Sequence, residues 1–247
     1  MNLTQENLRE KEFHNKLQSK KKERYENRFY KAISNLNTDY FEYLGKNATG
    51  SVILDYGCGI GNSVVEVIKH KPKKIIGIDI SEISIEKAKA RAQELGIDAE
   101  YIVDNCEKTN LNDNSFDIVY GSGILHHLKI EKCLDEINRI LKSKGTLVFI
   151  EPLATNPIIN LYRKLTPNSR SKDEHPLVKE DLKYIKSRFF DTNIKYYGFL
   201  TLVFFPFYSN PGKSNFFKIL SKVDQILFKS KFFRLFAWSV LITAKKN

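Results

Sequence analysis

A glycine-rich segment that follows Asp55 is the part of the chain with the clearest potential for ligand chemistry. The apolar run Val52–Leu54 ends at Asp55, and three glycines follow at alternate positions, Gly57, Gly59 and Gly61. Glycines in a turn between a strand and a helix let the backbone approach a ligand closely. Asp79 ends a second apolar run, where a carboxylate can accept hydrogen bonds from both ribose hydroxyls. These residues predict a nucleoside site.

The glycine spacing argues against a dinucleotide. The fingerprint G-x-G-x-x-G would place its third glycine where Asn62 stands, and Gly61 breaks the pattern. The site is therefore expected to hold an adenosine through its ribose, without a pyrophosphate at the helix N-terminus. S-adenosylmethionine meets that description, and an NAD-linked reductase is disfavoured.

Apolar runs alternate with amphipathic segments between Ser51 and Ile150, which indicates strands alternating with helices and hence a parallel, doubly wound sheet. Strands are predicted at 52–54, 74–80, 100–103, 116–120 and 146–150, with helices at about 62–70, 81–96 and 131–141.

The pattern changes after Pro152. Four prolines between 152 and 190 predict an insertion of short helices and turns. A strand is expected over 192–207, an amphipathic helix over 215–229 and a final strand over 237–244, the two strands being antiparallel neighbours at the sheet edge.

The whole chain is thus predicted to be α/β, with a Rossmann-like, mostly parallel seven-stranded sheet. Its expected parts are an N-terminal helical cap (1–46), a cofactor-binding core (47–151), a helical lid inserted after strand five (152–191) and a closing segment (192–247) that completes the same domain. In the cap, Phe29, Ala32, Ile33, Leu36 and Tyr40 form an apolar stripe, whereas the run 20–22 is charged.

The motifs between Asp55 and Glu151 resemble those of the class I S-adenosylmethionine-dependent methyltransferases, within the type 11 or ubiquinone/menaquinone-biosynthesis-like group. The resemblance implies that Asp55 helps to hold the methionine ammonium and that Asp79, with Ile80, holds the ribose. It also implies that the backbone of the glycine segment, which includes Cys58, passes beneath the cofactor.

Two further segments match motifs of that family. Residues 104–107 match the segment that contacts adenine, with Asp104 and Asn105 as alternative partners of its amino group and Cys106 as a backbone contact. Residues 120–128, which include Gly121, resemble the loop that passes the methyl group and sulfonium.

Candidate catalytic residues are His126, His127, Glu151 and His175. A general base is needed only where the acceptor loses a proton. Adjacent side chains point in different directions, so at most one of His126 and His127 lines the pocket, and a structural role for either stays open.

The segment 153–190 resembles a lid found in one bacterial subset of the family, which also has a counterpart of the pair Phe13-His14. In this lid, Arg163, Arg170 and His175 are candidates to bind an anionic acceptor, or His175 to act as the base. The alternative is that ion pairs of Arg170 with nearby acids hold the lid together.

The formal net charge of +11 is confined to one end of the chain. Residues 1–151 carry 23 basic and 23 acidic side chains, whereas residues 152–247 carry 17 basic and 6 acidic ones, and 12 of the 17 Phe lie between Phe189 and Phe236. Residues 199–236 are therefore predicted either to pack as a buried edge strand with its covering helix, or to form an acceptor channel that docks peripherally on an anionic membrane.

Composition excludes several classes of protein. Three cysteines, Cys58, Cys106 and Cys133, without a C-x-x-C pair argue against a disulfide scaffold and a structural zinc site, so no metal is predicted. The first residues lack an apolar signal region, and no apolar run reaches the roughly 20 residues of a membrane span, so a cytoplasmic location is expected.

The sequence therefore predicts an S-adenosylmethionine-dependent methyltransferase, with S-adenosylhomocysteine as product, that acts on oxygen or carbon of a small hydrophobic, prenylated or lipid-like acceptor. An RNA methyltransferase is a second hypothesis, disfavoured because the strand ending at Tyr120 is not followed by the Asn/Asp-Pro-Pro-aromatic motif that resembles base amino methylation. A non-catalytic partner protein that binds S-adenosylmethionine is the third.

Overall fold

The computed structural model describes residues 3–19, 28–166, 171–208 and 210–247. Its strands are β1 (Val52–Tyr56), β2 (Lys74–Asp79), β3 (Glu100–Val103), β4 (Phe116–Ser122), β5 (Leu141–Pro152), β6 (Phe190–Tyr197) and β7 (Ser239–Lys245). Its α-helices are α1 (Gln5–Ser19), α2 (Ser34–Ala48), α3 (Val64–Val67), α4 (Glu82–Leu95), α5 (Ile130–Ile140), α6 (Pro157–Leu165), α7 (Lys179–Arg188), α8 (Leu200–Val203) and α9 (Asn215–Leu227). Short 3-10 helices are η1 (Arg28–Ile33), η2 (Ile68–His70), η3 (Leu125–His127), η5 (Phe205–Phe207), η6 (Pro211–Lys213) and η7 (Phe233–Phe236).

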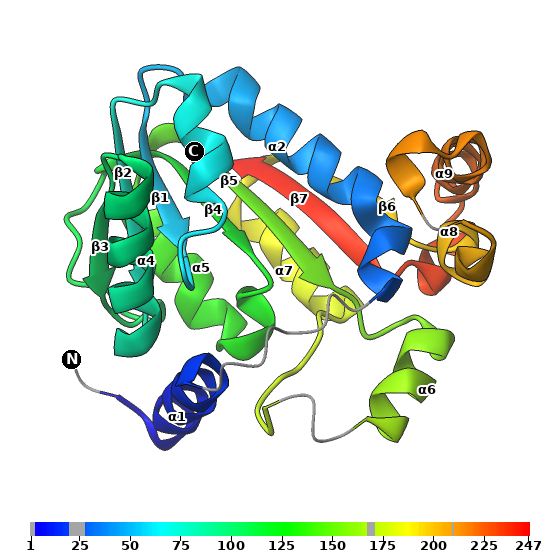
Figure 1. The fold of residues 1–247 in the computed structure, drawn as a ribbon, viewed down its shortest axis with the longest axis horizontal. Coiled ribbons are helices and arrows are strands. Elements are labelled where there is room, and N and C mark those ends of the chain that lie inside the picture. Colours follow the sequence, from blue (N-terminus) through cyan, green and yellow to red (C-terminus); the bar gives the residue numbers. More distant parts are fainter. Residues whose placement is uncertain (1–2, 20–27, 167–170, 209) are drawn as a thin grey trace.

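The seven strands form one sheet in the order β3-β2-β1-β4-β5-β7-β6 (Figure 1). Strands β1 to β5 pair in parallel, and β7 runs antiparallel to both β5 and β6. The predicted Rossmann-like, mostly parallel sheet is confirmed, as is the antiparallel pair at its edge.

Helices cover both faces of the sheet because alternate strand residues point to opposite faces. Ile53 and Ile75 contribute to an apolar cluster with α2, α3 and α4, whereas Leu54 and Ile76 contribute to a second cluster with α5 and α7. With both faces covered, the carboxyl ends of the parallel strands form the open edge at which α/β proteins bind ligands.

The strand expected over 192–207 is shorter than predicted. Strand β6 ends at Tyr197, and the chain turns at Gly198, where φ is +82° and an added Cβ would lie 2.7 Å from Ile33. Helix α8 follows, because the buried carboxylate of Asp224 accepts the backbone N–H groups of Phe199, Leu200 and Thr201. The helix expected over 62–70 is also interrupted, since α3 passes into η2 at Ile68.

The N-terminal segment divides into two parts with different surroundings. Ala32, Ile33, Leu36 and Tyr40 are buried against the sheet, as predicted, and α2 continues to Ala48. Helix α1 lies apart from α2, beside α4 and the strand ends (Figure 1). The charged run 20–22 lies outside the described residues. Within the described part of the chain, no helix has both the length and the apolar character needed to cross a membrane.

Candidate active site

The glycine turn after β1 lies at the carboxyl edge of the sheet and has one open side. Gly59 adopts φ +52°, and a Cβ added there would meet no atom within 4 Å. At Gly57, with φ +75°, a Cβ would instead lie 2.6 Å from the Ile124 side chain. The turn therefore packs against the protein at Gly57 and is open at Gly59, so a ligand could approach its backbone closely there. The buried ring of Tyr101 supports it, since its Oη would lie 2.7 Å from a Cβ on Gly61.

Asp79 orients this turn. Its carboxylate accepts a hydrogen bond from the backbone N–H of Gly59 and another from that of Ser81, each 2.9 Å long. Burial raises the pKa of Asp79, although both backbone hydrogen bonds act in the opposite direction. The neighbouring Ile80 is half-buried. A carboxylate held rigidly beside an open glycine turn fits a ribose with two vicinal hydroxyls.

Asp55 presents a buried carboxylate with one unsatisfied oxygen, and the Tyr120 hydroxyl beside it acts to lower its pKa. Its side chain is 2% exposed, and Oδ2 has no hydrogen-bond partner among the described residues. Burial raises the pKa of Asp55 to about 7, and the charge of Asp79 acts in the same direction. An unsatisfied buried acceptor is costly, and an ammonium group would satisfy it. Asp55, Gly59 and Asp79 thus fit the amino acid and ribose ends of S-adenosylmethionine.

The loop after β3 is held by its own side chains. Both oxygens of Asp104 accept hydrogen bonds within the loop, from Asn105 and Asn110. Asn105 accepts from the Glu107 backbone and donates to Asn7 Oδ1 at 3.3 Å, which links this loop to α1. Which of Asp104 and Asn105 contacts adenine stays a prediction. Cys106 is buried and its backbone carbonyl accepts from the Tyr56 hydroxyl.

Glu151 and His126 form a buried pair beneath the loop after β4. One Glu151 oxygen accepts the backbone N–H groups of Ile124 and Leu125 at 2.9 and 2.8 Å, and the other lies 2.7 Å from Nδ1 of His126. Glu151 therefore fixes both the loop and the orientation of the imidazole. In the same region Gly121 allows close packing, since a Cβ there would lie 2.8 Å from the Tyr56 carbonyl oxygen.

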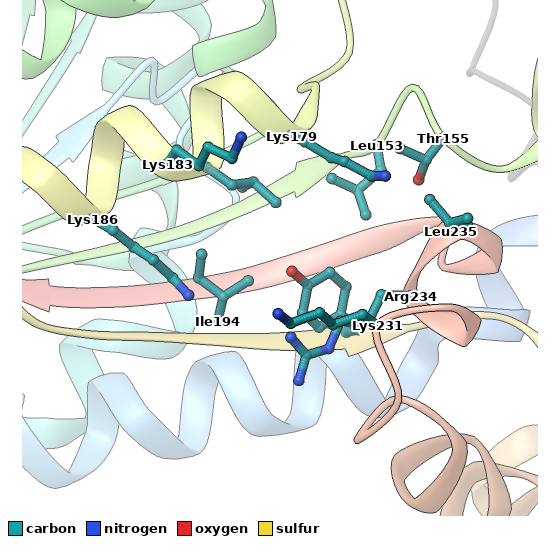
Figure 2. Close-up of a pocket in the computed structure, with 11 residues that line it drawn as sticks. Leu153, Thr155, Lys179, Lys183, Lys186, Ile194, Lys231, Arg234 and Leu235 are labelled. Carbon is teal, nitrogen blue, oxygen red and sulfur yellow. The ribbon is translucent and has the colours of Figure 1, made fainter.

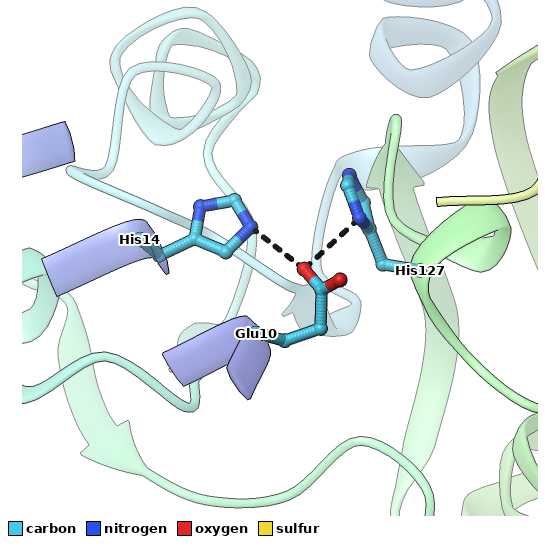
Figure 3. Close-up of side chains that lie close together, drawn as sticks. All are labelled: Glu10, His14 and His127. Carbon is cyan, nitrogen blue, oxygen red and sulfur yellow. Dashed lines mark ion pairs between the residues drawn. The ribbon is translucent and has the colours of Figure 1, made fainter. Parts of the chain in front are cut away.

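His127 faces helix α1 and not the Glu151 pair. Oε2 of Glu10 lies 3.2 Å from Nδ1 of His127 and 3.6 Å from Nε2 of His14 (Figure 3). Although burial opposes it, the neighbouring His127, His14 and Ser171 lower the pKa of Glu10 well below its ordinary value. Burial lowers the pKa of His127, more than Glu10 raises it.

Helix α1 also contacts the lid and α4. Arg9 donates two hydrogen bonds of 2.8 Å to the Asp173 carboxylate, and Ser171 donates to Glu10. On the other side Asn15 accepts from Ser81, two residues after Asp79. The helix therefore bridges the cofactor edge and the lid. The lid's His175 is exposed, with its backbone N–H bonded to the His126 carbonyl, and Arg170 lies outside the described residues.

A separate cavity of about 290 Å³ opens between α7, β6 and η7 (Figure 2). Five cationic side chains surround it, and its other lining residues are mainly apolar; the cations are Lys179, Lys183, Lys186, Lys231 and Arg234. Arg234 is fixed by a 2.7 Å hydrogen bond to the Phe228 carbonyl and lies over the Tyr196 ring. The cavity suits an anionic group attached to an apolar body.

Sequence reasoning did not identify the contacts made by Asn7, Glu10 and Asn15 of α1. The sequence offered one signal, the pair Phe13-His14, but the partners of α1 depend on where the helix docks. Ser81, where the helix predicted over 81–96 begins, is the N-cap of α4, and its hydroxyl accepts a hydrogen bond from the backbone N–H of Ser84.

Residues 54–149 match the family model described as "Methyltransferase domain". Two curated relatives are 24-methylenesterol C-methyltransferase 2 of Arabidopsis thaliana, 33% identical over 43% of this chain and 30% of that protein, and sterol 24-C-methyltransferase of Saccharomyces cerevisiae, 29% identical over 52% of this chain and 36% of that protein. This chain thus spans about a third of the length of these relatives.

The fold is shared with geranyl diphosphate C-methyltransferase from Streptomyces coelicolor A3(2), whose crystal structure contains Mg²⁺, geranyl diphosphate and S-adenosyl-L-homocysteine. The TM-score is 0.69 with 16% identity, and the match covers 100% of each chain. Residues 54–149 therefore match a methyltransferase domain, and the whole chain shares the fold of this structural neighbour, in agreement with the resemblance to S-adenosylmethionine-dependent methyltransferases. The cofactor of this class is S-adenosylmethionine.

Proposed function

We propose that the protein transfers the methyl group of S-adenosylmethionine to carbon or oxygen of a small hydrophobic, lipid-like acceptor. The observation that carries this proposal is the cofactor edge within the methyltransferase domain. There, the Asp55 carboxylate with its unsatisfied oxygen, the open turn at Gly59 and the anchored Asp79 carboxylate come together at the ends of β1 and β2.

The bound cofactor supplies an electrophilic methyl group, so the chain has mainly to align the acceptor and exclude water. Asp55 would hold the methionine ammonium and Asp79 the ribose hydroxyls. Helix α1, which is linked to Asn105, Ser81 and the lid, would cover the cofactor and exclude water from it.

Among the histidines, His126 is our candidate for the general base. A carbon acceptor that gains a methyl group must release a proton. Nδ1 of His126 lies 2.7 Å from the fully buried carboxylate of Glu151, whereas Nδ1 of His127 lies 3.2 Å from Glu10 on helix α1. With Nδ1 donating to Glu151, Nε2 is left to accept a proton. Glu151 would be a positioning residue, because both of its oxygens already have partners within the chain.

The acceptor class is supported by the names of the relatives. Two are named as methyltransferases that act on carbon of sterols, and the structural neighbour is a C-methyltransferase of geranyl diphosphate. A prenylated or sterol-like acceptor is therefore the favoured class. The RNA hypothesis loses support because the free thiols of Cys58, Cys106 and Cys133 are buried and burial raises the pKa of each, so none is available for attack on a base.

The test is transfer of a deuterated methyl group from labelled S-adenosylmethionine to a lipid extract, followed by mass spectrometry. We expect at least one lipid to gain a labelled methyl group. His126→Asn should reduce turnover by about 10²–10⁴-fold while the cofactor still binds, and His70→Asn, at an exposed histidine of η2, should have no effect. Cofactor binding without labelled product from any acceptor would instead identify a non-catalytic partner protein.

A second proposal concerns delivery of the acceptor: residues 199–236 dock on an anionic membrane. In support, α9 carries an exposed apolar stripe of Phe216, Ile219 and Ile226, flanked by exposed lysines, and Phe207 and Phe232 are 74% and 61% exposed. The cationic cavity opens beside η7, and three of its lining residues, Lys231, Arg234 and Leu235, belong to the same segment. Apolar side chains next to lysines are the features by which interfacial helices bind anionic lipid.

A further inference from the structure

Two histidines and a glutamate form a cluster between helix α1 and the loop after β4. Glu10 and His14 are one turn apart on α1, and His127 ends η3 (Figure 3). Each residue offers one ligand atom, and the three atoms lie within 4.8 Å of one another. Two chain segments far apart in sequence thus direct three electron-pair donors to one point.

The cluster is incompletely satisfied within the chain. Oε2 of Glu10 and Nδ1 of His127 are both buried and lie 3.2 Å apart as an ion pair, and neither makes a hydrogen bond of good geometry with any described residue. Buried polar atoms without a partner are rare and cost about 1–3 kcal/mol each. Since these two atoms and Nε2 of His14 face one another, one shared partner would satisfy all three.

The distances suit a metal ion as that partner. Bonds of about 2.0–2.1 Å from a tetrahedral zinc ion to nitrogen or oxygen place neighbouring ligand atoms about 3.4 Å apart. The two distances from Glu10 Oε2, 3.2 Å to His127 and 3.6 Å to His14, lie on either side of that value.

Residues around the cluster would support such a site. The other oxygen of Glu10 accepts a hydrogen bond from Ser171 of the lid. His126 and Glu174 have donor atoms within 4.8 Å of His127 and of each other. Metal-binding histidines and carboxylates commonly have partners of this kind, which hold their orientation.

We propose that Glu10, His14 and His127 bind one divalent transition metal ion of the zinc class, with a coordination position left for water or another ligand. Two imidazoles and one carboxylate suit zinc or a neighbouring transition metal, whereas magnesium and calcium prefer oxygen ligands throughout. The spacing of the cysteines argues against a structural zinc site. That objection does not apply to this cluster, because the cluster contains no cysteine.

The experiment uses the chelator-treated chain of 247 residues. One sample is titrated with Zn²⁺ in a calorimeter, and a second is titrated with Co²⁺ and followed by visible spectroscopy. We expect one equivalent of Zn²⁺ to bind, and Co²⁺ to give the intense absorption of a tetrahedral site. Glu10→Gln and His14→Gln should abolish both signals, and His70→Gln, at an exposed histidine, should leave them unchanged. Ser171→Ala should weaken binding about 10-fold, through its hydrogen bond to Glu10.

Thermal unfolding with and without Zn²⁺ provides a second measurement, because an ion that binds only the folded state raises the melting temperature. We expect Zn²⁺ to raise the melting temperature of the parent but not that of Glu10→Gln or His14→Gln. Equal Zn²⁺ affinity in the parent, Glu10→Gln and His14→Gln would overturn the proposal. So would a parent spectrum showing only the weak bands of octahedral Co²⁺. Either result concerns metal binding directly and leaves the proposed methyl transfer standing.

Discussion

At the scale of single residues, the carboxylate of Asp55 links ligand binding to pH. Burial raises its pKa from 3.8 to about 7, so the folded, ligand-free protein retains a proton that the unfolded chain loses as the pH rises above about 4. The unfolded state then binds fewer protons, and Asp55 lowers the free energy of unfolding progressively between about pH 4 and pH 7.

Asp55→Asn should therefore stabilise the ligand-free protein, by an amount that grows from about pH 4 to pH 7 and is constant above. Urea unfolding of the parent and the variant across this range measures it, with Asp98→Asn at an exposed position as the matched control. A stability difference between the parent and Asp55→Asn that does not vary with pH would refute the assignment.

Asp55 and Asp79 were predictable from sequence because each follows directly on an apolar strand, and parallel strand ends meet at one edge. The contact between Glu10 and His127 could not be predicted from sequence, because it depends on where helix α1 packs against the rest of the chain. Neither could sequence separate the roles of His126 and His127, which follow from their different partners, Glu151 and Glu10.

At the scale of elements, most strands and helices from β1 to β5 were predictable because hydrophobic periodicity and caps agree along that part of the chain. Two bounds were wrong: the helix predicted over 62–70 changes to η2 at Ile68, and β5 begins at Leu141, before the predicted 146. After β5, the strand predicted over 192–207 is shorter than expected, and the cause is a contact with a residue far away in sequence. Residues 199–203 are apolar and aromatic, which favours a strand, but the carboxylate of Asp224 from α9 binds the backbone N–H groups of Phe199–Thr201 and initiates helix α8.

Helix α1 offers the sharpest test at this scale. The Arg9–Asp173 ion pair joins α1 to the predicted lid, and Arg9 is about half exposed, so Arg9→Ala should change the free energy of unfolding very little. If α1 covers the cofactor, the same change should speed S-adenosylmethionine dissociation by up to about fivefold. Stopped-flow displacement measures this rate.

Arg188→Ala serves as the control, because Arg188 pairs with Asp135 between α7 and α5, elements that do not contact the bound cofactor in this account. Equal dissociation rates for the parent, Arg9→Ala and Arg188→Ala would show that α1 does not hold the cofactor in place.

At the scale of the whole molecule, charge and exposed apolar side chains coincide in the last third of the chain. The net charge of +11 arises after residue 151, where α9 exposes phenylalanine and isoleucine and Phe232, just before η7, is also exposed. We expect the protein to co-float with anionic liposomes at low salt, to be released at high salt, and to bind zwitterionic liposomes weakly.

The paired change Ile219→Ser and Phe207→Ser should abolish that flotation, whereas Leu95→Ser, at an exposed leucine of α4, should not. Flotation of the paired variant with the parent, or no association of the parent with any liposome, would rule out membrane docking through this segment.

The central claim is that the edge formed by β1 and β2 binds S-adenosylmethionine, and calorimetry of Asp79→Ala tests it most directly. Each ribose hydroxyl left without its acceptor costs about 1–3 kcal/mol, so affinity should fall about tenfold or more. Asp98→Ala, at an exposed aspartate in the connection between β2 and β3, should bind like the parent. Unchanged S-adenosylmethionine affinity in a folded Asp79→Ala variant would contradict the account.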